Sequence, residues 1–301
     1  MSQLAELNRR FAIPGMLEFK ALPNGYIAAS IANKHAGACI ALQGAHILSF
    51  QPRGQEPVIW LSPLAKFEAG KSVRGGVPVC WPWFGPHASN PAFPGHGFAR
   101  TVPWRVASSE MLEDGATRIA FEIEQNDATR AQWPHASSAR LTATVGKTLH
   151  IELTTRNNSY DAFTIGEALH TYFHISDIGK VEVTGLNGCD YLDKVGAGGR
   201  KTQQGALTFS GETDRIYLNT PGNCAIVDSG LKRRIRIASE NSRSTVVWTP
   251  WTEKADKMGD FGPDGWGGMV CVETANAADN VVRVGPQSEH CMSVTYSVEK
   301  M

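Results

Sequence analysis

A two-residue alternation of apolar and polar side chains constrains the fold of this chain more than any other feature. In "TRIAFEIEQ", Ile119, Phe121 and Ile123 alternate with charged residues, and "LTATVGKTLHIELTTRNN" repeats the alternation on both sides of a turn at residues 146–147. Successive side chains of a β-strand point to opposite faces of the sheet, so this pattern is typical of half-buried antiparallel strands.

Further segments extend this interpretation along the chain. "RRIRIASEN", "STVVWTPW" and "HCMSVTYSVE" are rich in β-branched and aromatic residues, whereas only "SQLAELNRRFA", with Ser2 as a possible N-cap, suggests a helix. Short strands separated by Gly and Pro predict an all-β fold, a large antiparallel β-sandwich with long connections. No linker or change of composition divides residues 1–301, so we expect a single domain. We expect "GAGGRKTQQG", residues 196–205, to be a mobile loop.

The charge balance and the cysteine content limit the classes of binding partner and the cellular compartment that we expect. Lys plus Arg equal Asp plus Glu at 29 each, so the molecule has no overall field that favours nucleic acid or an anionic membrane. The first residues lack the apolar core of a signal peptide, and no apolar run approaches the ~20 residues that cross a bilayer. Six cysteines without a C-x-x-C pair suit reduced thiols. We therefore expect a soluble cytoplasmic protein, and a monomer.

One long segment, residues 71–100, has neither helical nor strand periodicity. It reads "KSVRGGVPVCWPWFGPHASNPAFPGHGFAR" and combines glycines and prolines with arginines, histidines and aromatic residues. Loops longer than about 12 to 15 residues are uncommon in compact domains and are usually functional or disordered. The aromatic side chains favour order, so we expect a shaped loop that builds a functional surface.

Several familiar site signatures are missing from the sequence. There is no phosphate-binding G-x-x-x-x-G-K-[ST], no G-x-G-x-x-G between a strand and a helix, and no G-x-S-x-G. His170 and His174, in "EALHTYFHISD", have a spacing that would face one way on a helix and could bind a metal there. The surroundings are typical of a strand, so we expect no metal site and a core or hydrogen-bonded role for His174.

Three segments combine titratable and aromatic residues. They are "RGGVPVCWPWFG…HGFAR", "GEALHTYFHISDI" and "TPWTEKADKMGDFGPDGWGGMVCVETANA". In this order and at this separation, they resemble the aldose 1-epimerase superfamily, and specifically its D-hexose-6-phosphate mutarotase branch, also called glucose-6-phosphate 1-epimerase. The resemblance spans roughly residues 25–299. It implies a galactose-mutarotase-like supersandwich and the interconversion of the α and β anomers of a hexose 6-phosphate.

The resemblance also assigns a general base and a general acid. The base of the family corresponds to Glu273 in "CVETAN" and the acid to His170 in "ALHTYF". This chemistry removes a proton from the anomeric hydroxyl and gives one to the ring oxygen, and Glu and His side chains suit these tasks near neutral pH. No cofactor is required. The alternatives are a structural ion pair for Glu273 and a hydrogen-bonded core position for His170.

Five further residues are candidates for substrate binding. The glycines after Arg74 allow a close backbone approach, and Arg74 and Arg100 together can bind a phosphate through paired hydrogen bonds. Alternatively, either arginine ties the loop to a carboxylate. His96, in "GHGFAR", is expected to hydrogen-bond the sugar or to stabilise the loop. Some members of the family have Gln before this histidine, where this chain has Gly95.

Asp214 and Trp266 complete this set. Asp214, in "ETDRIY", resembles a family position near the sugar hydroxyls, but it can equally form a surface pair with Arg215. Trp266, in "PDGWGG", can stack on a sugar face or fill the core.

Rival functions come from other classes of protein. A non-catalytic carbohydrate-binding protein would share the sandwich and the aromatic residues, and a glycoside hydrolase or lyase would share a carboxylate in a sugar cleft. A binding module has no use for a paired acid and base, and hydrolysis normally needs a second catalytic carboxylate, for which Asp214 is the available candidate. An aldose 1-epimerase that acts on unphosphorylated sugars is a further alternative.

Overall fold

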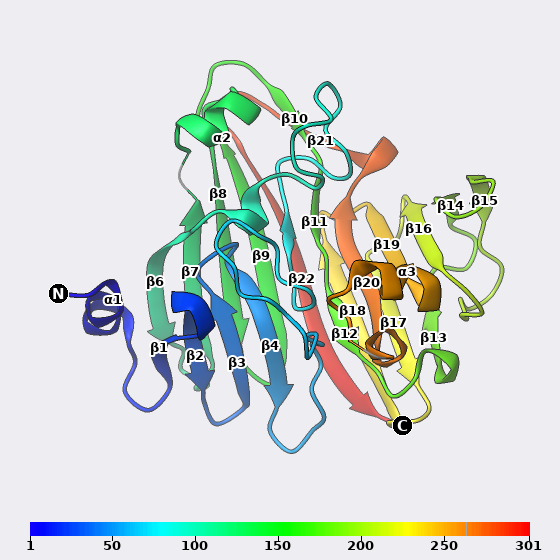
Figure 1. The fold of residues 1–301 in the computed structure, drawn as a ribbon, viewed down its shortest axis with the longest axis horizontal. Helices are drawn as coiled ribbons and strands as arrows, with labels where there is room; N and C mark the ends of the chain where they lie inside the picture. The colour runs from blue at the N-terminus through cyan, green and yellow to red at the C-terminus, as the bar shows by residue number, and fades with distance from the viewer. Residues whose placement is uncertain (124, 263) are drawn as a thin grey trace.

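The computed structural model describes residues 1–123, 125–262 and 264–301, and every pairing between its named strands is antiparallel. One layer is an eight-stranded sheet, here called the rear sheet, with the order β13-β17-β18-β22-β9-β8-β7-β6 (Figure 1). Its strands are β6 (Arg105–Met111), β7 (Thr117–Ile123), β8 (Ser137–Val145), β9 (Leu149–Asn157), β13 (Val181–Thr184), β17 (Asn223–Asp228), β18 (Arg233–Glu240) and β22 (Glu289–Lys300).

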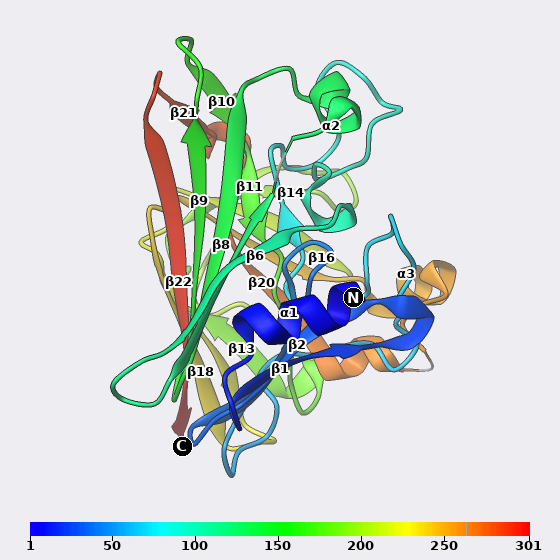
Figure 2. The ribbon, with the colours of Figure 1, turned by 90° about the vertical axis from the view of Figure 1, so that its left-hand side faces the viewer.

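The second layer contains two sheets, and Figure 2 shows it facing the long strands of the rear sheet. A four-stranded sheet has the order β1-β2-β3-β4, and a second eight-stranded sheet, here called the front sheet, has the order β15-β14-β16-β19-β20-β11-β5, with β12 also paired to β20. The strands of the four-stranded sheet are β1 (Leu17–Ala21), β2 (Ile27–Ala32), β3 (Ala36–Ala41) and β4 (His46–Pro52). Those of the front sheet are β5 (Val79–Cys80), β11 (Glu167–Leu169), β12 (Tyr172–His174), β14 (Asp190–Asp193), β15 (Gly199–Thr202), β16 (Thr213–Leu218), β19 (Ser244–Thr249) and β20 (Met269–Asn276).

The remaining elements are short. β10 (Phe163–Ile165) and β21 (Val282–Val284) form a separate pair. The predicted helix near the N-terminus is confirmed as α1 (Gln3–Phe11), with the Ser2 side chain accepting a hydrogen bond from the Ala5 backbone N–H. Two helices were not predicted, α2 (Asp127–Gln132) and α3 (Trp251–Met258). Single 3₁₀ turns cover Pro23–Gly25, Ala99–Thr101, Ile178–Lys180, Gly265–Gly268 and Ala278–Asn280.

The apolar core lies between the layers. One cluster of buried side chains joins the small sheet, the rear sheet and the front sheet, with Ile40, Leu141 and Val272 as examples from each. Burying apolar surface between two sheets is the main favourable contribution in such a fold. The sandwich predicted from the alternating segments is therefore confirmed.

One local prediction was wrong. The segment of residues 196–205 is expected to be a mobile loop because of its glycines, but residues 199–202 within it form β15 and pair with β14 in a regular antiparallel register. All four residues of β15 are exposed, which is why no apolar alternation marks this edge strand in the sequence. In the described part of the chain, no helix is long and apolar enough to span a membrane.

Candidate active site

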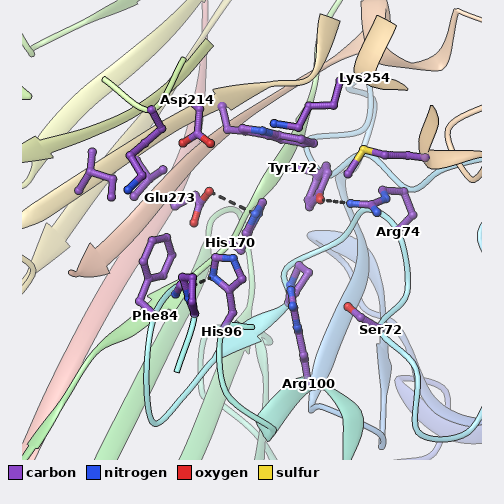
Figure 3. A pocket seen from close by; sticks show the side chains of 18 of the residues that line it. Ser72, Arg74, Phe84, His96, Arg100, His170, Tyr172, Asp214, Lys254 and Glu273 are labelled. Carbon is purple, nitrogen blue, oxygen red and sulfur yellow. Dashed lines mark hydrogen bonds and ion pairs between the residues drawn. The ribbon is translucent and has the colours of Figure 1, made fainter. Parts of the chain in front are cut away.

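A pocket of about 580 Å³ lies over the face of the front sheet that points away from the core (Figure 3). Strands β12, β16, β19 and β20 supply its floor, the long loop of residues 71–100 supplies one side, and α3 supplies part of the rim. The residues that line it are Ser72, Val73, Arg74, Pro78, Phe84, Gly85, Pro86, His96, Arg100, His170, Tyr172, Leu192, Lys194, Asp214, Ile216, Val246, Trp248, Lys254, Met258, Glu273 and Ala278.

Strand alternation explains which side chains reach the floor. In β20, Val270 and Val272 pack into the core between the layers, so the side chain of Glu273 points to the opposite face. The register then places Val246 of β19 beside Glu273. Residues directly opposite each other on neighbouring strands share a face, so the floor is continuous across the sheet.

Glu273 and His170 are in direct contact on this floor. The distance from His170 Nε2 to Glu273 Oε1 is 3.3 Å, and the two side chains are only 13% and 2% exposed. Glu273 Oε2 and His170 Nδ1 are buried and have no hydrogen-bond partner among the described residues. Buried polar atoms are usually satisfied in folded proteins, so these two atoms leave hydrogen-bonding capacity for a bound molecule.

Burial shifts both pKa values toward the neutral forms. It raises the pKa of Glu273 well above its usual range, and the neighbouring Asp214 carboxylate acts in the same direction. Burial also lowers the pKa of His170 well below its usual value, with further contributions from His96 and Arg100. A carboxylic acid beside a neutral imidazole holds the same number of protons as a carboxylate beside an imidazolium. One proton transfer across the contact converts the first state into the second, and in each state one member is an acid and the other a base.

His96 lines the pocket and also holds the loop in place. Its Nδ1 accepts a hydrogen bond from the Gly85 backbone N–H at 3.3 Å, so the ring stabilises the loop. The pKa of His96 is lowered to about 4 by burial and by Arg100, which makes the ring neutral near pH 7. A neutral imidazole whose Nδ1 is an acceptor carries its proton on Nε2. His96 therefore presents a hydrogen-bond donor while lining the pocket.

The two arginines line the same pocket but are held differently. Arg74 Nε donates to Asp260 Oδ1 at 3.0 Å and Nη1 donates to the Tyr172 hydroxyl at 2.9 Å, so this arginine does tie the loop to a carboxylate. Arg100 Nη2 donates to the Gly95 carbonyl at 2.9 Å, and no ion pair involves Arg100 in residues 1–123, 125–262 and 264–301. Arg100 is therefore the freer of the two cations.

Asp214 lines the floor, as the sequence suggested. It lies opposite Trp248 in the pairing of β16 with β19, and burial raises its pKa. Arg215 points to the other face of β16, where its guanidinium lies 4.6 Å from the Tyr191 ring centroid and donates to Gln203 Oε1 at 3.2 Å. The structure thus contains no Asp214–Arg215 pair among the described residues.

Two other candidates lie outside the pocket. Trp266 is absent from its lining and packs against Trp251 with ring centroids 4.9 Å apart. His174 is half-buried at the end of β12, its backbone N–H donates to the Val58 carbonyl at 2.9 Å, and it does not line the pocket. Among the described residues, no group of three or more His, Cys, Asp or Glu side chains is placed to hold a metal ion.

Several lining residues were missed by the sequence reasoning. Tyr172 stacks on His170 with ring centroids 5.0 Å apart, and Trp248 lies edge-on to the same ring at 6.0 Å. Lys254, from α3, forms a 2.6 Å ion pair with Glu212 at the rim. Tyr172 and Trp248 belong to segments whose pattern predicts strands. The pattern does not show which face of a strand lines the pocket, so it could not identify these two side chains.

The model of the aldose 1-epimerase family matches residues 28–297. The chain belongs to the aldose 1-epimerase family. A provisionally named glucose-6-phosphate 1-epimerase of Escherichia coli K12 is 43% identical over 244 residues, which cover 80% of both chains. A similarly named protein of Cenchrus ciliaris is 35% identical over 259 residues, 83% of this chain and 78% of the relative.

Solved structures place the fold of this family member among the mutarotases. The crystal structure of a provisionally named mutarotase from Salmonella typhimurium superposes with a TM-score of 0.90 at 34% identity, covering 100% of both chains. The galactose 1-epimerase of Lactobacillus acidophilus superposes with a TM-score of 0.67 over 94% of this chain and 98% of the other, and at 13% identity it supports the fold alone.

Proposed function

We propose that this enzyme interconverts the α and β anomers of a hexose 6-phosphate, with glucose 6-phosphate as its substrate. The observation that carries the proposal is the buried Glu273–His170 contact of 3.3 Å on the floor of a pocket that also holds two arginines. The names of the relatives support the choice of substrate. Because anomers have the same composition and oxidation state, the reaction needs no oxidant and no group donor, only proton transfers that open and re-close the sugar ring.

In the proposed mechanism, the pair works in its carboxylate and imidazolium form. Glu273 accepts the proton of the anomeric hydroxyl while His170 gives a proton to the ring oxygen, so the C1–O5 bond breaks and a C1 carbonyl forms. Rotation about C1–C2 presents the other face of the carbonyl. The C5 hydroxyl then attacks it, and both protons return to their donors. The protein ends with the protons with which it began.

The phosphate is proposed to lie at the end of the pocket lined by Arg100 and Arg74. Guanidinium groups bind phosphate oxygens through paired, charge-assisted hydrogen bonds. Arg100 supplies the main contact because its guanidinium has only the Gly95 carbonyl as a hydrogen-bond partner among the described residues. Arg74 contributes its positive charge and its Nη2 group, which makes no hydrogen bond among the described residues. Its hydrogen bonds to Asp260 and Tyr172 fix the orientation of the guanidinium.

Anomer exchange measured by saturation-transfer NMR tests the proposal. The parent protein is added to equilibrated glucose 6-phosphate, galactose 6-phosphate and unphosphorylated glucose, and exchange between the anomeric signals is followed. We expect acceleration for the hexose 6-phosphates and little for glucose. Equal acceleration of glucose would instead assign an aldose 1-epimerase of unphosphorylated sugars, and binding without acceleration would assign a carbohydrate-binding protein.

We further propose that the enzyme acts as a monomer in the cytoplasm. All six cysteines are free thiols, which suits a reducing compartment. Every residue proposed for the chemistry comes from one chain, so the site needs no contribution from a second copy.

A further inference from the structure

The chain turns sharply at His170, between β11 and β12. The Thr171 backbone N–H donates to the Leu169 carbonyl at 2.9 Å, which closes a tight turn with His170 at its centre. The Thr171 hydroxyl lies 3.3 Å from the same carbonyl. The backbone N–H and the hydroxyl of Thr171 thus both hold the turn from which the His170 imidazole reaches Glu273.

A tyrosine of the rear sheet lies behind this turn. Thr171 Oγ1 is 2.6 Å from the hydroxyl oxygen of Tyr296 in β22, and neither residue is exposed to solvent. Thr274, the residue after Glu273, borders the same phenol: burial raises the pKa of Tyr296, and the Thr171 and Thr274 hydroxyls act in the opposite direction. Both residues that follow the proposed acid and base therefore point away from the pocket, toward one hydroxyl group.

Either hydroxyl group can donate in the hydrogen bond between Thr171 and Tyr296. If Tyr296 donates to Thr171 Oγ1, the proton of Thr171 remains free for the Leu169 carbonyl, and both hydroxyl protons are used. If Thr171 donates to Tyr296 instead, its bond to Leu169 is lost. In the second arrangement the phenol proton is left for Thr274, and in both arrangements the hydrogen bond joins the turn at His170 to β22.

We infer that Tyr296 and Thr171 are positioning residues, which hold the turn at His170 so that its imidazole meets Glu273. The inference rests on the proposed function of the pair. Neither residue lines the pocket, so neither contacts the substrate. Reactions that depend on aligned groups lose rate steeply when those groups move by a fraction of an ångström to one ångström. Loosening the turn should therefore lower kcat and leave KM nearly unchanged.

Four single variants test this inference. Thr171→Val and Tyr296→Phe each remove one hydroxyl of the bond and keep the shape, Thr171→Ser keeps the hydroxyl, and Tyr217→Phe is the matched control. Tyr217 is equally buried, and its hydroxyl donates to Gln203 Oε1 at 2.8 Å rather than to Thr171 or Tyr296. For anomer exchange of glucose 6-phosphate, we expect kcat to fall roughly 10- to 100-fold in Thr171→Val and Tyr296→Phe, with KM within about twofold. Thr171→Ser and Tyr217→Phe should stay within about threefold of the parent.

In the double variant Thr171→Val/Tyr296→Phe, kcat should fall no further than in the slower single variant, because both changes break the same hydrogen bond.

A second measurement does not depend on activity. The ¹⁵N and ¹H NMR signals of the His170 ring should move in Thr171→Val and Tyr296→Phe and stay in place in Tyr217→Phe. A parent without anomer exchange would overturn the proposed function but leave this NMR comparison intact. Unmoved His170 signals, or an equal fall of kcat in Tyr217→Phe, would overturn the inference.

Discussion

At the scale of single residues, the pocket is lined by side chains of both charges. Glu273 and Asp214 lie on the floor, whereas Arg74 and Arg100 are contributed by the long loop. The net charge of the chain is zero, so an anionic substrate must be recognised by such a local group of cations. Discrimination between a phosphorylated and a plain sugar should therefore depend on one or two guanidinium groups.

Arg100→Met tests this discrimination. Methionine keeps much of the apolar stem and removes the hydrogen-bond donors. The fall in kcat/KM for glucose 6-phosphate should therefore correspond to a loss of about 2 to 3 kcal/mol of transition-state stabilisation, as expected for hydrogen bonds to charged groups. The rate for unphosphorylated glucose should barely change. Both values come from NMR anomer exchange. An equal fall for both sugars would mean that Arg100 only builds the loop.

Arg74→Met is expected to be less selective. Its guanidinium also binds Asp260 and Tyr172, and Tyr172 stacks on His170. Removing it should lower kcat/KM for both sugars, with the larger loss for glucose 6-phosphate, and should lower the melting temperature. A purely phosphate-specific loss with unchanged melting would contradict the structural role of this residue.

Histidine burial predicts how stability depends on pH. The pKa of the fully buried His46 is lowered from 6.5 to about 4, chiefly by burial. Between these pH values the unfolded chain binds a proton that the native protein does not, so the free energy of unfolding falls as the pH is lowered from 6.5 to 4. His96 acts in the same direction, and Glu273, whose pKa is raised, acts in the opposite one.

Comparing variants isolates the contribution of His46. In urea unfolding between pH 7 and pH 4, the parent should lose roughly 3 kcal/mol more than His46→Gln, because a shift of one pKa unit corresponds to about 1.4 kcal/mol. His35→Gln, at a half-buried histidine whose Nε2 lies 2.9 Å from the Asp114 carbonyl, is the control and should follow the parent. Parallel curves for the parent and His46→Gln would contradict a buried neutral His46.

The sequence located the candidate acid and base but not their surroundings. His170 and Glu273 lie within short motifs, so they could be chosen before the fold was known. Tyr172 and Trp248 could not, because alternation shows that a strand has two faces and not which face bears a pocket. Trp266 was selected for its aromatic ring beside glycines, yet it packs on Trp251, since core filling is an equally good use of that ring.

At the scale of elements, long strands with an apolar face were predictable and short exposed ones were not. The alternation in the sequence covers all nine residues of β9 and residues 141–145 of β8. β15 has four exposed residues and follows a glycine-rich turn, and α3 begins two residues after β19 ends, within a segment assigned to a strand. In both cases contacts with neighbouring elements decide the structure, and these contacts are not encoded locally.

A buried polar cluster fixes β11 against β20, the strands next to the proposed acid and base. Asn276 Nδ2 donates to Glu167 Oε1 at 2.9 Å and to the Asn241 carbonyl at 2.8 Å, and Asn276 Oδ1 accepts from the Arg243 backbone N–H. His290 of β22 contacts the same carboxylate at 2.8 Å. Side chains of three strands thus meet at one buried carboxylate.

Asn276→Ala should destabilise the fold by about 2 to 4 kcal/mol, because it leaves several buried polar groups without partners. Asn158→Ala is the control, since Asn158 is exposed and its side chain makes no hydrogen bond within the described residues. Urea unfolding measures both variants. A loss in Asn276→Ala as small as that of the control would show that the cluster does not secure the two strands.

At the scale of the whole molecule, the two faces of the front sheet have different roles. The inner face of the front sheet packs into the core, and the outer face holds the pocket, while the loop of residues 71–100 closes one side of it. A rigid sheet can therefore present Glu273 and His170 with little freedom, and the loop supplies Arg74 and Arg100. We propose that Glu273 and His170 transfer the protons of anomer exchange.

The most direct test is the rate of glucose 6-phosphate anomer exchange in Glu273→Gln and His170→Asn, measured by saturation-transfer NMR on folded proteins. Removing either proton-transfer group should lower kcat by on the order of 10² to 10⁴. Glu18→Gln, an exposed carboxylate on β1, serves as the control and should match the parent. Exchange near the parent rate in either Glu273→Gln or His170→Asn would contradict the account.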